Sequence, residues 1–485
     1  MEEQDQMDTG IDIKQETNEM NDIDDNMEAS GSSSTAVSTS SNVTGKNRKK
    51  KKKKKKKKPK TNEASKNSEI DTEEVDDGGE ASQTAEETEP QVYLPGGPME
   101  EGEELNFDSS AYKMYHQVQC GAPCLSFDII PDNLGDNRTE FPMTMYLAAG
   151  TQSESSKQNY LIVLKMSDLQ EMEEEQSDEE DAIDDEPDLT MGQIKHNGAV
   201  NRVKFANIPG RQVVSTWSET GKVHIWDISR QFIEIDNDDS GKNVTSDHKP
   251  LYTFRGHQTE GFAMDWSRTV PGRLLTGDCN RNIHLWNPTE DNSWQVDQRP
   301  YSSHTKSVED LQWSPNEATV FASCSVDKTI KVWDIRAAPS KACMLTAQAH
   351  DADVNVISWN RNEPLLVSGG DDGAIKVWDL RQFQSGEPIA VFKHHTDAIT
   401  SVEWSSTDNS VFAASGSDNQ ITLWDLAVER DDEGQQGRPV DVPPQLLFIH
   451  MGQKDIKELH WHAQLPGVVV STAEDSFNVF KTISV

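Results

Sequence analysis

The sequence HTKSVEDLQWSPNEATVFASCSVDKTIKVWD, residues 304–334, is followed by a second version of the same pattern, HDADVNVISWNRNEPLLVSGGDDGAIKVWD, residues 350–379. Each version opens with a histidine, passes through a polar turn and ends in a short alternating strand closed by Trp-Asp. Outward from this pair the closing tryptophan recurs at spacings of 60, 47, 45 and 46 residues, at Trp226, Trp286, Trp333, Trp378 and Trp424. A period of about 45 residues indicates a fold built from similar repeated units.

The opening histidine of the unit recurs with the same period, at His196, His257, His304, His350, His395 and His450. Arg255-Gly256-His257 carries a full Gly-His pair. Four short strands per unit and a Gly-His…Trp-Asp pattern resemble WD40 repeats. Six units are readable, and the strand-like runs between Leu125 and Met166 supply a seventh. We therefore predict an all-β fold, a seven-bladed WD40 β-propeller, because a closed ring leaves no long exposed sheet edge.

The polar residues of the repeat have a structural interpretation. In WD40 blades the opening His, a strand Ser or Thr, the turn Asp and the closing Trp form a hydrogen-bonded network, and two units match it with His304, Ser323, Asp327 and Trp333 and with His350, Ser368, Asp372 and Trp378. Thr220 replaces the aspartate in the unit ending at Trp226, and Ala414 replaces the serine or threonine in the unit ending at Trp424. We expect those two blades to be less firmly tied, and we expect the buried His and Asp residues to be structural rather than catalytic.

Composition divides the chain into a folded part and charged segments. The 485 residues carry a net charge of −38, and the first 105 hold 26 acidic and 15 basic side chains. We predict a disordered acidic tail with a polylysine tract over residues 1–104, and a short N-terminal helix with a divergent first blade over 105–170. Residues 171–188 hold 12 acidic and no basic side chains, which indicates a disordered acidic loop over 171–190. WD40 repeats over 191–485 would complete the propeller.

Several classes of protein are disfavoured. No apolar stretch approaches the roughly 20 residues of a membrane-spanning helix, and the polar, acidic start does not resemble a secretory signal. Five cysteines fit a reducing compartment rather than a disulfide framework. The chain lacks a phosphate-binding Gly-rich loop and a Gly-x-Ser-x-Gly motif, and Cys120 and Cys124 have no second pair with which to bind a metal. We expect no enzymatic activity, no catalytic residues, no cofactor and no metal site, and no membrane partner.

A block of ten consecutive lysines follows Arg48. It indicates import into the nucleus and nucleolus, while a solvated charge run is the alternative. Specific nucleic-acid recognition is not expected, because no aromatic residue is interleaved for base stacking. The predicted import residues are Lys49, Lys50, Lys51, Lys52, Lys53, Lys54, Lys55, Lys56, Lys57 and Lys58.

Acidic runs beside an import signal suggest a basic client that needs a competing negative surface. The alternative is a loop that only promotes solubility. The predicted client-binding residues of this run are Glu173, Glu174, Glu175, Asp178, Glu179, Glu180 and Asp181. Ser177 precedes three acidic residues and is a candidate site for an acid-directed kinase, which would add about −1.5 to −2 of charge.

Segments outside the repeats narrow the resemblance. The run from Leu105 to Met166, the long acidic insertion, Glu458-Leu459-His460-Trp461-His462 and the ending Lys481-Thr482-Ile483-Ser484-Val485 closely resemble the glutamate-rich WD-repeat family, which is related to the retinoblastoma-binding-protein-like histone-binding WD proteins. The resemblance implies a ribosome-assembly factor that chaperones one large-subunit ribosomal protein, and also a histone-binding, chaperone-like factor in chromatin. The implied partners are a large-subunit ribosomal protein, histones and pre-ribosomal particles.

The resemblance also implies a client groove. In the histone-binding relatives an N-terminal helix and an acidic loop ending in Pro-Pro clamp a histone helix. Residues 106–119 would form that helix, with Phe107, Tyr112 and Tyr115 facing the client. The loop before His450 would supply Asp431, Asp432 and Glu433, followed by Pro443-Pro444. The run after the prolines also fits an ordinary strand, and the two interpretations are compatible.

Three functions from different classes remain open. The first is a nuclear and nucleolar chaperone for a basic ribosomal protein in large-subunit assembly, and the second is a histone-binding chromatin regulator. The third is a substrate receptor that binds the adaptor of a cullin-type ubiquitin ligase, since Trp333-Asp334-Ile335-Arg336 and Trp378-Asp379-Leu380-Arg381 both fit the Trp-Asp-x-Arg motif of such receptors. Arg336 and Arg381 fit ordinary strand-end residues equally well.

Overall fold

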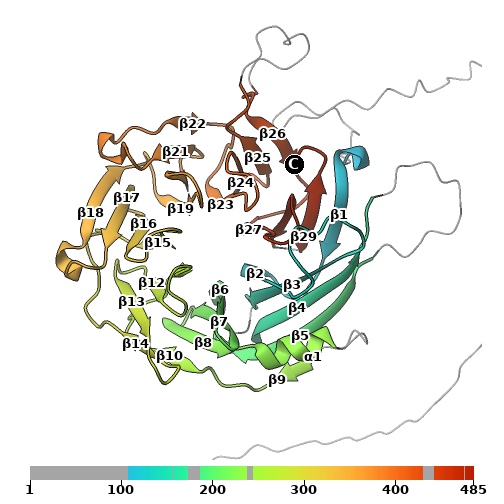
Figure 1. Cartoon of the computed structure of the whole chain (residues 1–485), viewed down its shortest axis with the longest axis horizontal. Helices are drawn as coiled ribbons and strands as arrows, with labels where there is room; N and C mark the ends of the chain where they lie inside the picture. Colours follow the sequence, from blue (N-terminus) through green and yellow to red (C-terminus); the bar gives the residue numbers. More distant parts are fainter. Residues whose placement is uncertain are drawn as a thin grey trace, which may run out of the picture. The chain divides into compact units, whose positions relative to one another are not determined.

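The computed structural model describes residues 107–153, 155, 157–172, 186–237, 244–429, 442–474 and 476–485. These residues form seven antiparallel sheets arranged as the blades of one ring (Figure 1). The predicted seven-bladed propeller is therefore confirmed. The predicted tail over 1–104, with Lys49 to Lys58, lies outside the described residues, and so does most of the predicted loop over 171–190, with Ser177.

The blades follow one another along the chain, each running from the channel outward. The first contains β2 (Cys124–Ile130), β3 (Met143–Thr151), β4 (Asn159–Leu169) and β5 (Asp188–His196), with β9 (Val244–Ser246) added in parallel to β5. The second contains β6 (Val200–Ile208), β7 (Arg211–Ser218), β8 (Lys222–Asp227) and β10 (Tyr252–Phe254). The third contains β11 (Ala263–Trp266), β12 (Leu274–Gly277), β13 (Ile283–Pro288) and β14 (Trp294–Val296).

The next three blades have the same order. The fourth contains β15 (Val308–Trp313), β16 (Val320–Ser325), β17 (Thr329–Asp334) and β18 (Cys343–Gln348). The fifth contains β19 (Val354–Trp359), β20 (Leu365–Gly370), β21 (Ile375–Asp379) and β22 (Ala390–Phe392). The sixth contains β23 (Ile399–Trp404), β24 (Val411–Gly416), β25 (Ile421–Asp425) and β26 (Leu446–His450).

The seventh blade closes the ring with strands from both ends of the described chain. It contains β27 (Glu458–Trp461), β28 (Val468–Thr472), β29 (Phe477–Thr482) and β1 (Tyr112–Val118). β1 runs antiparallel to β29, with Tyr112 opposite Thr482 and Val118 opposite Phe477, and the two lie side by side near the C-terminus (Figure 1). Pairing of β1 covers the outer edge of β29, which would otherwise expose unpaired backbone groups.

The predicted helix over residues 106–119 is wrong. The structure has only a 3-10 turn, η1 (Ser109–Ala111), followed by strand β1. Tyr112, Met114, His116 and Val118 are buried and alternate with more exposed residues, which is the period of a strand. Two further 3-10 turns, η2 (Pro339–Lys341) and η3 (Phe383–Ser385), and one α-helix, α1 (Ser229–Asp236), are present in the described residues. α1 packs Phe232 and Ile235 against the first blade.

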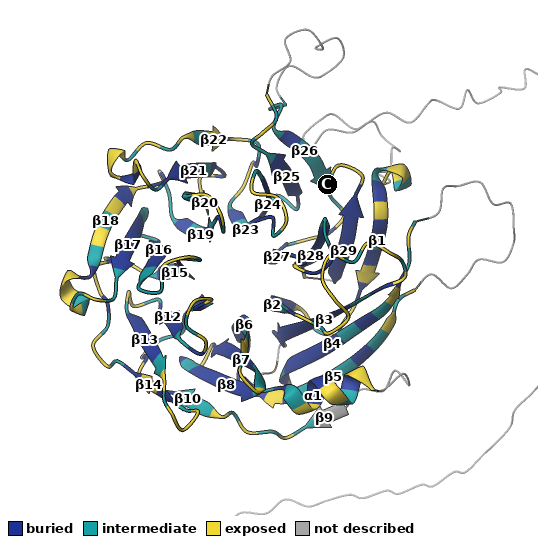
Figure 2. Cartoon of the chain, viewed as in Figure 1, coloured by how far each residue is buried: buried dark blue, intermediate teal, exposed yellow. Residues whose placement is uncertain are grey.

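The core lies between neighbouring blades, where the repeat places its large residues. The closing tryptophans Trp286, Trp333, Trp378 and Trp424 are at most 1% exposed, and the second strand of every blade is largely buried (Figure 2). Phe321 stacks on Trp333 and Phe412 stacks on Trp424, with ring planes 7° and 9° apart. The same packing recurs because the same residue types recur at the same register.

The polar network of the repeat forms as predicted in the fourth and fifth blades. His304 Nδ1 donates to Asp327 Oδ2 at 2.9 Å, Ser323 Oγ lies 2.7 Å from His304 Nε2, and Trp333 Nε1 donates to the same hydroxyl at 2.8 Å. His350, Asp372, Ser368 and Trp378 repeat this geometry, with distances of 2.8 to 2.9 Å. These buried polar groups satisfy one another within the blade, as the structural interpretation requires.

The two blades expected to be less firmly tied differ from each other. In the second blade His196 Nε2 lies 3.1 Å from the hydroxyl of Thr216, and His196 Nδ1 lies 2.9 Å from the carbonyl oxygen of Gly198. The hydroxyl of Thr220, where the aspartate would be, forms a hydrogen bond with that of Ser218 instead. The expectation for the sixth blade is wrong. Thr422, on the neighbouring strand, takes the place of the missing hydroxyl at Ala414 and lies 2.9 Å from His395 Nε2 and 2.7 Å from Trp424 Nε1. The network is therefore complete in the sixth blade.

Candidate client-binding surface

A group of aromatic rings lies where the sixth and seventh blades meet. We call Phe107, Tyr112, Tyr115, Phe448 and His450 the aromatic shelf. The ring centroid of Tyr112 lies 5.5 Å from that of Tyr115, 5.2 Å from that of Phe448 and 5.7 Å from that of His450. Phe107 lies 5.2 Å from Tyr115 and 6.2 Å from Tyr112. Residues more than 300 positions apart in the chain are thus brought into one surface.

Hydrogen bonds to His450 fix the shelf. Asn478 Nδ2 donates to His450 Nε2 at 3.1 Å, and His450 Nδ1 donates to Tyr112 Oη at 2.8 Å. Burial lowers the pKa of His450 to about 3, so the ring is neutral and carries one donor and one acceptor. Burial also raises the pKa of Tyr112, with smaller contributions from Tyr115 and Asp108. A neutral, fully partnered pair holds the two blades together at this point.

The three predicted groove residues lie together but are not equally accessible. Phe107 is 49% exposed, Tyr115 is partly exposed and Tyr112 is only 8% exposed. Tyr112 therefore supports the shelf, while Phe107 and Tyr115 present apolar surface to solvent. Phe448, on β26, adds a partly exposed ring from the strand that follows Pro443-Pro444. The strand interpretation of this run is confirmed, because Leu446–His450 form β26.

The predicted acidic client-binding residues lie outside the described residues: Glu173, Glu174, Glu175, Asp178, Glu179, Glu180 and Asp181 in one segment, and Asp431, Asp432 and Glu433 in the other. The described ends of the two segments lie at β1 and β26, the strands that carry shelf residues. Met172 donates its backbone N–H to the carbonyl of Lys113 in β1 at 2.9 Å and packs against the shelf. After the second segment, Gln445 donates to the carbonyl of Val428 at 3.0 Å immediately before β26.

Arg336 and Arg381 lie at the ends of the third strands of two adjacent blades, and each is bound to the aspartate of its own Trp-Asp pair. Arg336 Nε donates to Asp334 at 2.9 Å, and Arg381 Nη2 lies 2.8 Å from Asp379 Oδ2. Their side chains are 73% and 69% exposed. The hydrogen bonds from the two guanidinium groups lower the pKa of Asp334 and Asp379. Both arginines are accessible from solvent while held in place.

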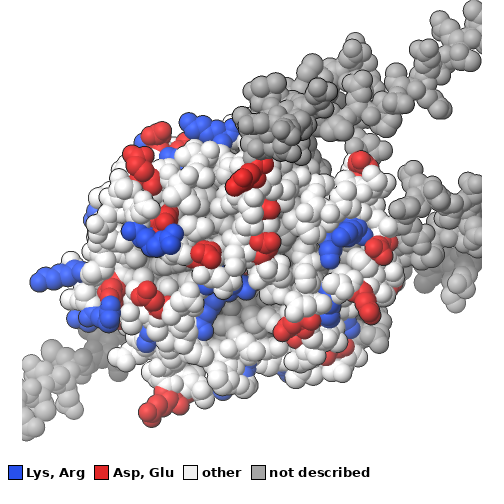
Figure 3. Space-filling view, turned by 45° about the horizontal axis from the view of Figure 1, so that its top comes forward, with Lys and Arg blue, Asp and Glu red and all other residues white. Residues whose placement is uncertain are grey.

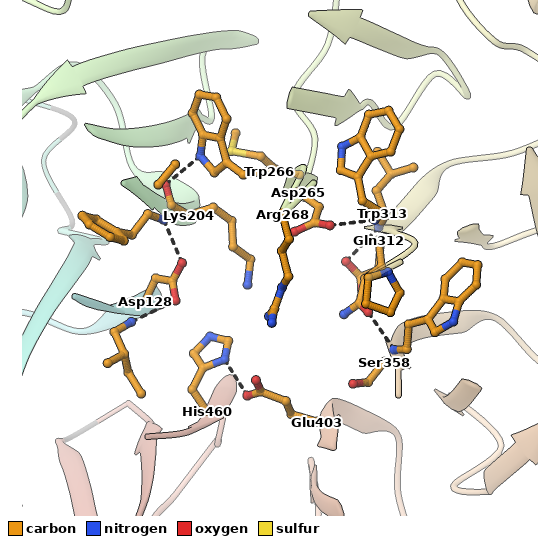
Figure 4. A pocket seen from close by; sticks show the side chains of 18 of the residues that line it. Asp128, Lys204, Asp265, Trp266, Arg268, Gln312, Trp313, Ser358, Glu403 and His460 are labelled. Atoms are coloured by element: carbon orange, nitrogen blue, oxygen red, sulfur yellow. Dashed lines mark hydrogen bonds and ion pairs between the residues drawn. The ribbon is translucent and has the colours of Figure 1, made fainter. Parts of the chain in front are cut away.

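The structure also shows a central channel whose lining was not predicted from the sequence. Near the end of most inner strands a side chain reaches to the next blade. Asp128 accepts from the backbone N–H of Phe205, and Asp265 from that of Trp313, each at 2.7 Å. The seven residues at this level, one per blade, surround a cavity of about 440 Å³ (Figure 4): Asp128, Lys204, Asp265, Gln312, Ser358, Glu403 and His460.

A charged cluster is buried next to this ring of side chains. Glu458 is 2% exposed, and its Oε1 accepts from Arg202 at 3.0 Å, Lys204 at 3.2 Å and His460 at 3.2 Å. Burial alone would lower the pKa of His460, but Glu403 and Glu458 raise it to about 10. Burial would raise the pKa of Glu458, but Lys204, Arg202 and His460 hold it well below its usual range. These groups are charged and mutually satisfied, so we assign them a structural role.

The residues that the structure describes contain no group of three or more His, Cys, Asp or Glu side chains placed to hold a metal ion. No helix among them has the length and apolar character that crossing a membrane requires.

Comparison with known proteins agrees with this arrangement. Residues 102–170 match the family model of histone-binding protein RBBP4, a family that includes a component of the CAF1 complex, and residues 296–334, 341–379 and 386–425 match the WD domain, G-beta repeat model. Ribosome assembly protein rrb1 of Schizosaccharomyces pombe is 44% identical over 81% of this chain and 84% of its own length. Glutamate-rich WD repeat-containing protein 1 of Dictyostelium discoideum is 44% identical over 79% and 83%.

A solved structure is similar in fold. The WD40 β-propeller domain of Doa1 superposes with a TM-score of 0.51 and 14% sequence identity, covering 76% of this chain and 96% of that one. At this identity the likeness concerns the propeller architecture alone.

Proposed function

Because the chain belongs to the family that contains ribosome assembly protein rrb1 and glutamate-rich WD repeat-containing protein 1, we propose that it acts in ribosome assembly as a non-enzymatic propeller scaffold. Its client is a basic protein, in the first place a large-subunit ribosomal protein on its way to pre-ribosomal particles. The polylysine tract directs the chain to the nucleus and nucleolus, where such particles are built.

One observation carries this proposal: two acidic segments end at β1 and β26, the strands that carry the exposed aromatic shelf. Phe107, Tyr115 and Phe448 offer apolar area to one face of a client segment. Residues 171–188 alone hold 12 carboxylates, which attract the Lys and Arg side chains of the same segment and speed its encounter with the shelf. A ribosomal protein that is not yet bound to RNA has both features, apolar surface and excess positive charge.

The proposal is tested by titrating the full chain with the large-subunit ribosomal protein at near-physiological salt. Deletion of residues 173–185 should weaken binding and leave the thermal unfolding midpoint unchanged, because these residues lie between the ends of β4 and β5. Phe107→Ala should weaken binding as well, by roughly 1–2 kcal/mol for a partly buried aromatic anchor.

Leu134→Ala is the matched control for Phe107→Ala, because Leu134 is 59% exposed in the loop between β2 and β3. It should leave the affinity unchanged. Equal affinities for wild type, the deletion and Phe107→Ala would refute the proposed surface.

Histones are the second candidate client. The histone-binding family model covers residues 102–170. These include β1 and three of the five shelf residues, Phe107, Tyr112 and Tyr115. The same titration with core histones decides between the two clients. Tighter and less salt-sensitive binding of histones than of the ribosomal protein would make the chain a chromatin factor first.

A role as substrate receptor of a cullin-type ligase rests on the exposed Arg336 and Arg381. The Arg336→Glu, Arg381→Glu double variant should abolish association with the ligase adaptor if this role exists. Arg299→Glu is the control, because Arg299 makes the same short-range pair with Asp297 and is 77% exposed, yet belongs to no Trp-Asp-x-Arg motif. Equal adaptor association of all three proteins would exclude the role.

A further inference from the structure

The central cavity of about 440 Å³ is lined by residues from all seven blades. Figure 3 shows the ring from a second direction, with lysine and arginine atoms gathered beside the hollow at its centre. The volume falls in the range of about 300–1,000 Å³ that small-molecule sites occupy. The charged groups of this cavity differ in whether each already has a partner.

The carboxylates of the cavity are occupied. Glu458 neutralises the buried cations next to the ring. Glu403 accepts from His460 Nδ1 at 2.8 Å and from the backbone N–H of Trp461 at 3.1 Å. Asp128 and Asp265 each accept a backbone N–H from the next blade. These groups hold the ring of blades together and are not free to bind a cation.

Two arginines at the cavity are different. Arg268 follows β11 of the third blade and Arg361 follows β19 of the fifth, and both line the cavity. Within the part of the chain that the structure describes, neither guanidinium group makes a hydrogen bond or an ion pair. Arg268 extends into the cavity from its rim (Figure 4). Burial lowers the pKa of Arg361 and Arg268 lowers it further, while Glu403 raises it. The two positive charges therefore act on each other, beside carboxylates that other groups already occupy.

Some other exposed arginines of this chain are paired: Arg299, Arg336 and Arg381 each bind the aspartate two residues earlier. Arg255 and Arg281 are exposed outside the cavity. Arg268 and Arg361 differ from all of these because they line one cavity together. An anion that bridges them would relieve their repulsion and complete the hydrogen bonding of both forks.

We propose that the central cavity binds a phosphate group, held between Arg268 and Arg361. A phosphate dianion matches two guanidinium charges, and its oxygens match the planar arginine fork. A single carboxylate would balance only one of them. The phosphate belongs either to a small phosphorylated molecule or to a phosphorylated side chain of a peptide. This site is separate from the aromatic shelf, and it selects the opposite charge to that of the proposed client.

The test uses the full-length chain with residues 49–58 changed to serine, so that the lysine tract does not bind the probes. Isothermal titration at constant ionic strength compares tripolyphosphate, a phosphoserine peptide and the unphosphorylated peptide. We expect saturable binding of at least one phosphorylated probe and none of the unphosphorylated peptide. Binding of tripolyphosphate alone identifies a small-molecule ligand, and binding of the phosphopeptide identifies a protein source.

Variants locate the site. The Arg268→Gln, Arg361→Gln double variant should weaken phosphate binding by about tenfold or more, as expected for loss of charge-assisted bidentate contacts. The Arg299→Gln, Arg336→Gln double variant is the matched control and should bind as the parent does. Thermal unfolding of both variants checks that the ring is intact. Absence of saturable binding by the parent, or equal binding by the cavity variant, would overturn the proposal.

Discussion

Replacement of Glu458 by glutamine tests how the channel is held together. Its carboxylate is 2% exposed and accepts from Arg202, Lys204 and His460 through Oε1, and from the backbone N–H of Phe127 through Oε2 at 3.1 Å. Glutamine has the same shape and keeps an acceptor for Phe127. It removes the negative charge with which Arg202, Lys204 and His460 all pair.

Breaking a buried ion pair by removing one partner costs about 3–5 kcal/mol. Water in the adjoining cavity can solvate part of Lys204 and Arg202, so we expect a loss of about 2–4 kcal/mol for Glu458→Gln. A propeller of this size loses roughly 1.5 °C of Tm per kcal/mol, which gives a fall of about 3–6 °C. Glu474→Gln is the control, because Glu474 pairs with Lys454 at 3.5 Å and its side chain is 57% exposed. Such a pair contributes about 0–1 kcal/mol.

The deficit of Glu458→Gln also depends on pH. The pKa of His460 is raised from 6.5 to about 10 in the folded protein, so its contribution is complete below pH 6.5 and is lost as the pH rises toward 10. The Tm difference between wild type and variant should therefore be largest near pH 6 and smaller at pH 10, measured by circular dichroism melts. A Tm within about 1 °C of wild type, or a deficit that does not change with pH, would refute the reasoning.

Three further variants test single contacts. Asp372→Ala should lower the unfolding free energy by about 1–3 kcal/mol at pH 7. Burial would raise the pKa of Asp372, but hydrogen bonds, chiefly from His350, lower it to about 2. Denaturant titration should therefore show the deficit of the variant vanishing as the pH falls from 3.8 to 2. Asp265→Asn should raise the Tm at pH 8 and leave it unchanged below pH 4. Burial raises the pKa of Asp265 from 3.8 to about 7, so stability is lost as the pH rises from 3.8 to 7 and the loss is complete above that pH; a lower Tm at pH 8 would contradict this. Thr422→Ala should cost about 1–3 kcal/mol in thermal unfolding by leaving buried ring nitrogens unpaired, and Thr422→Ser should restore most of it.

The ring of blades could be predicted because its determinants repeat. His, Asp and Trp recur at fixed offsets and make the same contacts in the third to sixth blades, so one well-formed unit such as 304–334 predicts the others. The strand-like runs between Leu125 and Met166 correspond to β2, β3 and β4 of the first blade. Local sequence is sufficient here because each blade satisfies its polar groups mainly within itself.

The strand β1 was mistaken for a helix because its partner is distant. Its residues alternate in burial, but the aromatic residues Tyr112 and Tyr115 also fit one face of a helix, and nothing nearby decides between the two. The decision is made by β29, more than 350 residues later, whose edge needs a partner. The hydroxyl of Thr422 was also not predicted. It replaces the hydroxyl missing at Ala414 from the neighbouring strand, at a position the repeat pattern does not assign to this contact.

The channel residues were missed although a signal for them exists. In six blades a polar residue directly precedes an aromatic residue of the inner strand, which is the last residue of the strand in five of them: Lys204-Phe205, Asp265-Trp266, Gln312-Trp313, Ser358-Trp359, Glu403-Trp404 and His460-Trp461. Most of these polar residues reach to the next blade, yet their chemical types differ. Alignment by residue identity hides a position that is kept by geometry, whereas the alternation of polar and aromatic residues reveals it.

The seventh blade joins folding and proposed binding in one sheet. Its inner strand β27 carries Glu458 and His460 of the channel cluster, and its outer strand β1 carries Tyr112 of the aromatic shelf. Truncation of the chain through Val118 would therefore remove the shelf residues on and before β1 and, at the same time, open the ring. If the truncated chain lost client binding, that loss would not identify a binding surface. Phe107 separates the two effects, because it is 49% exposed and lies before β1. A variant at Phe107 that melts like wild type but binds its client weakly would show that the shelf itself makes the contact.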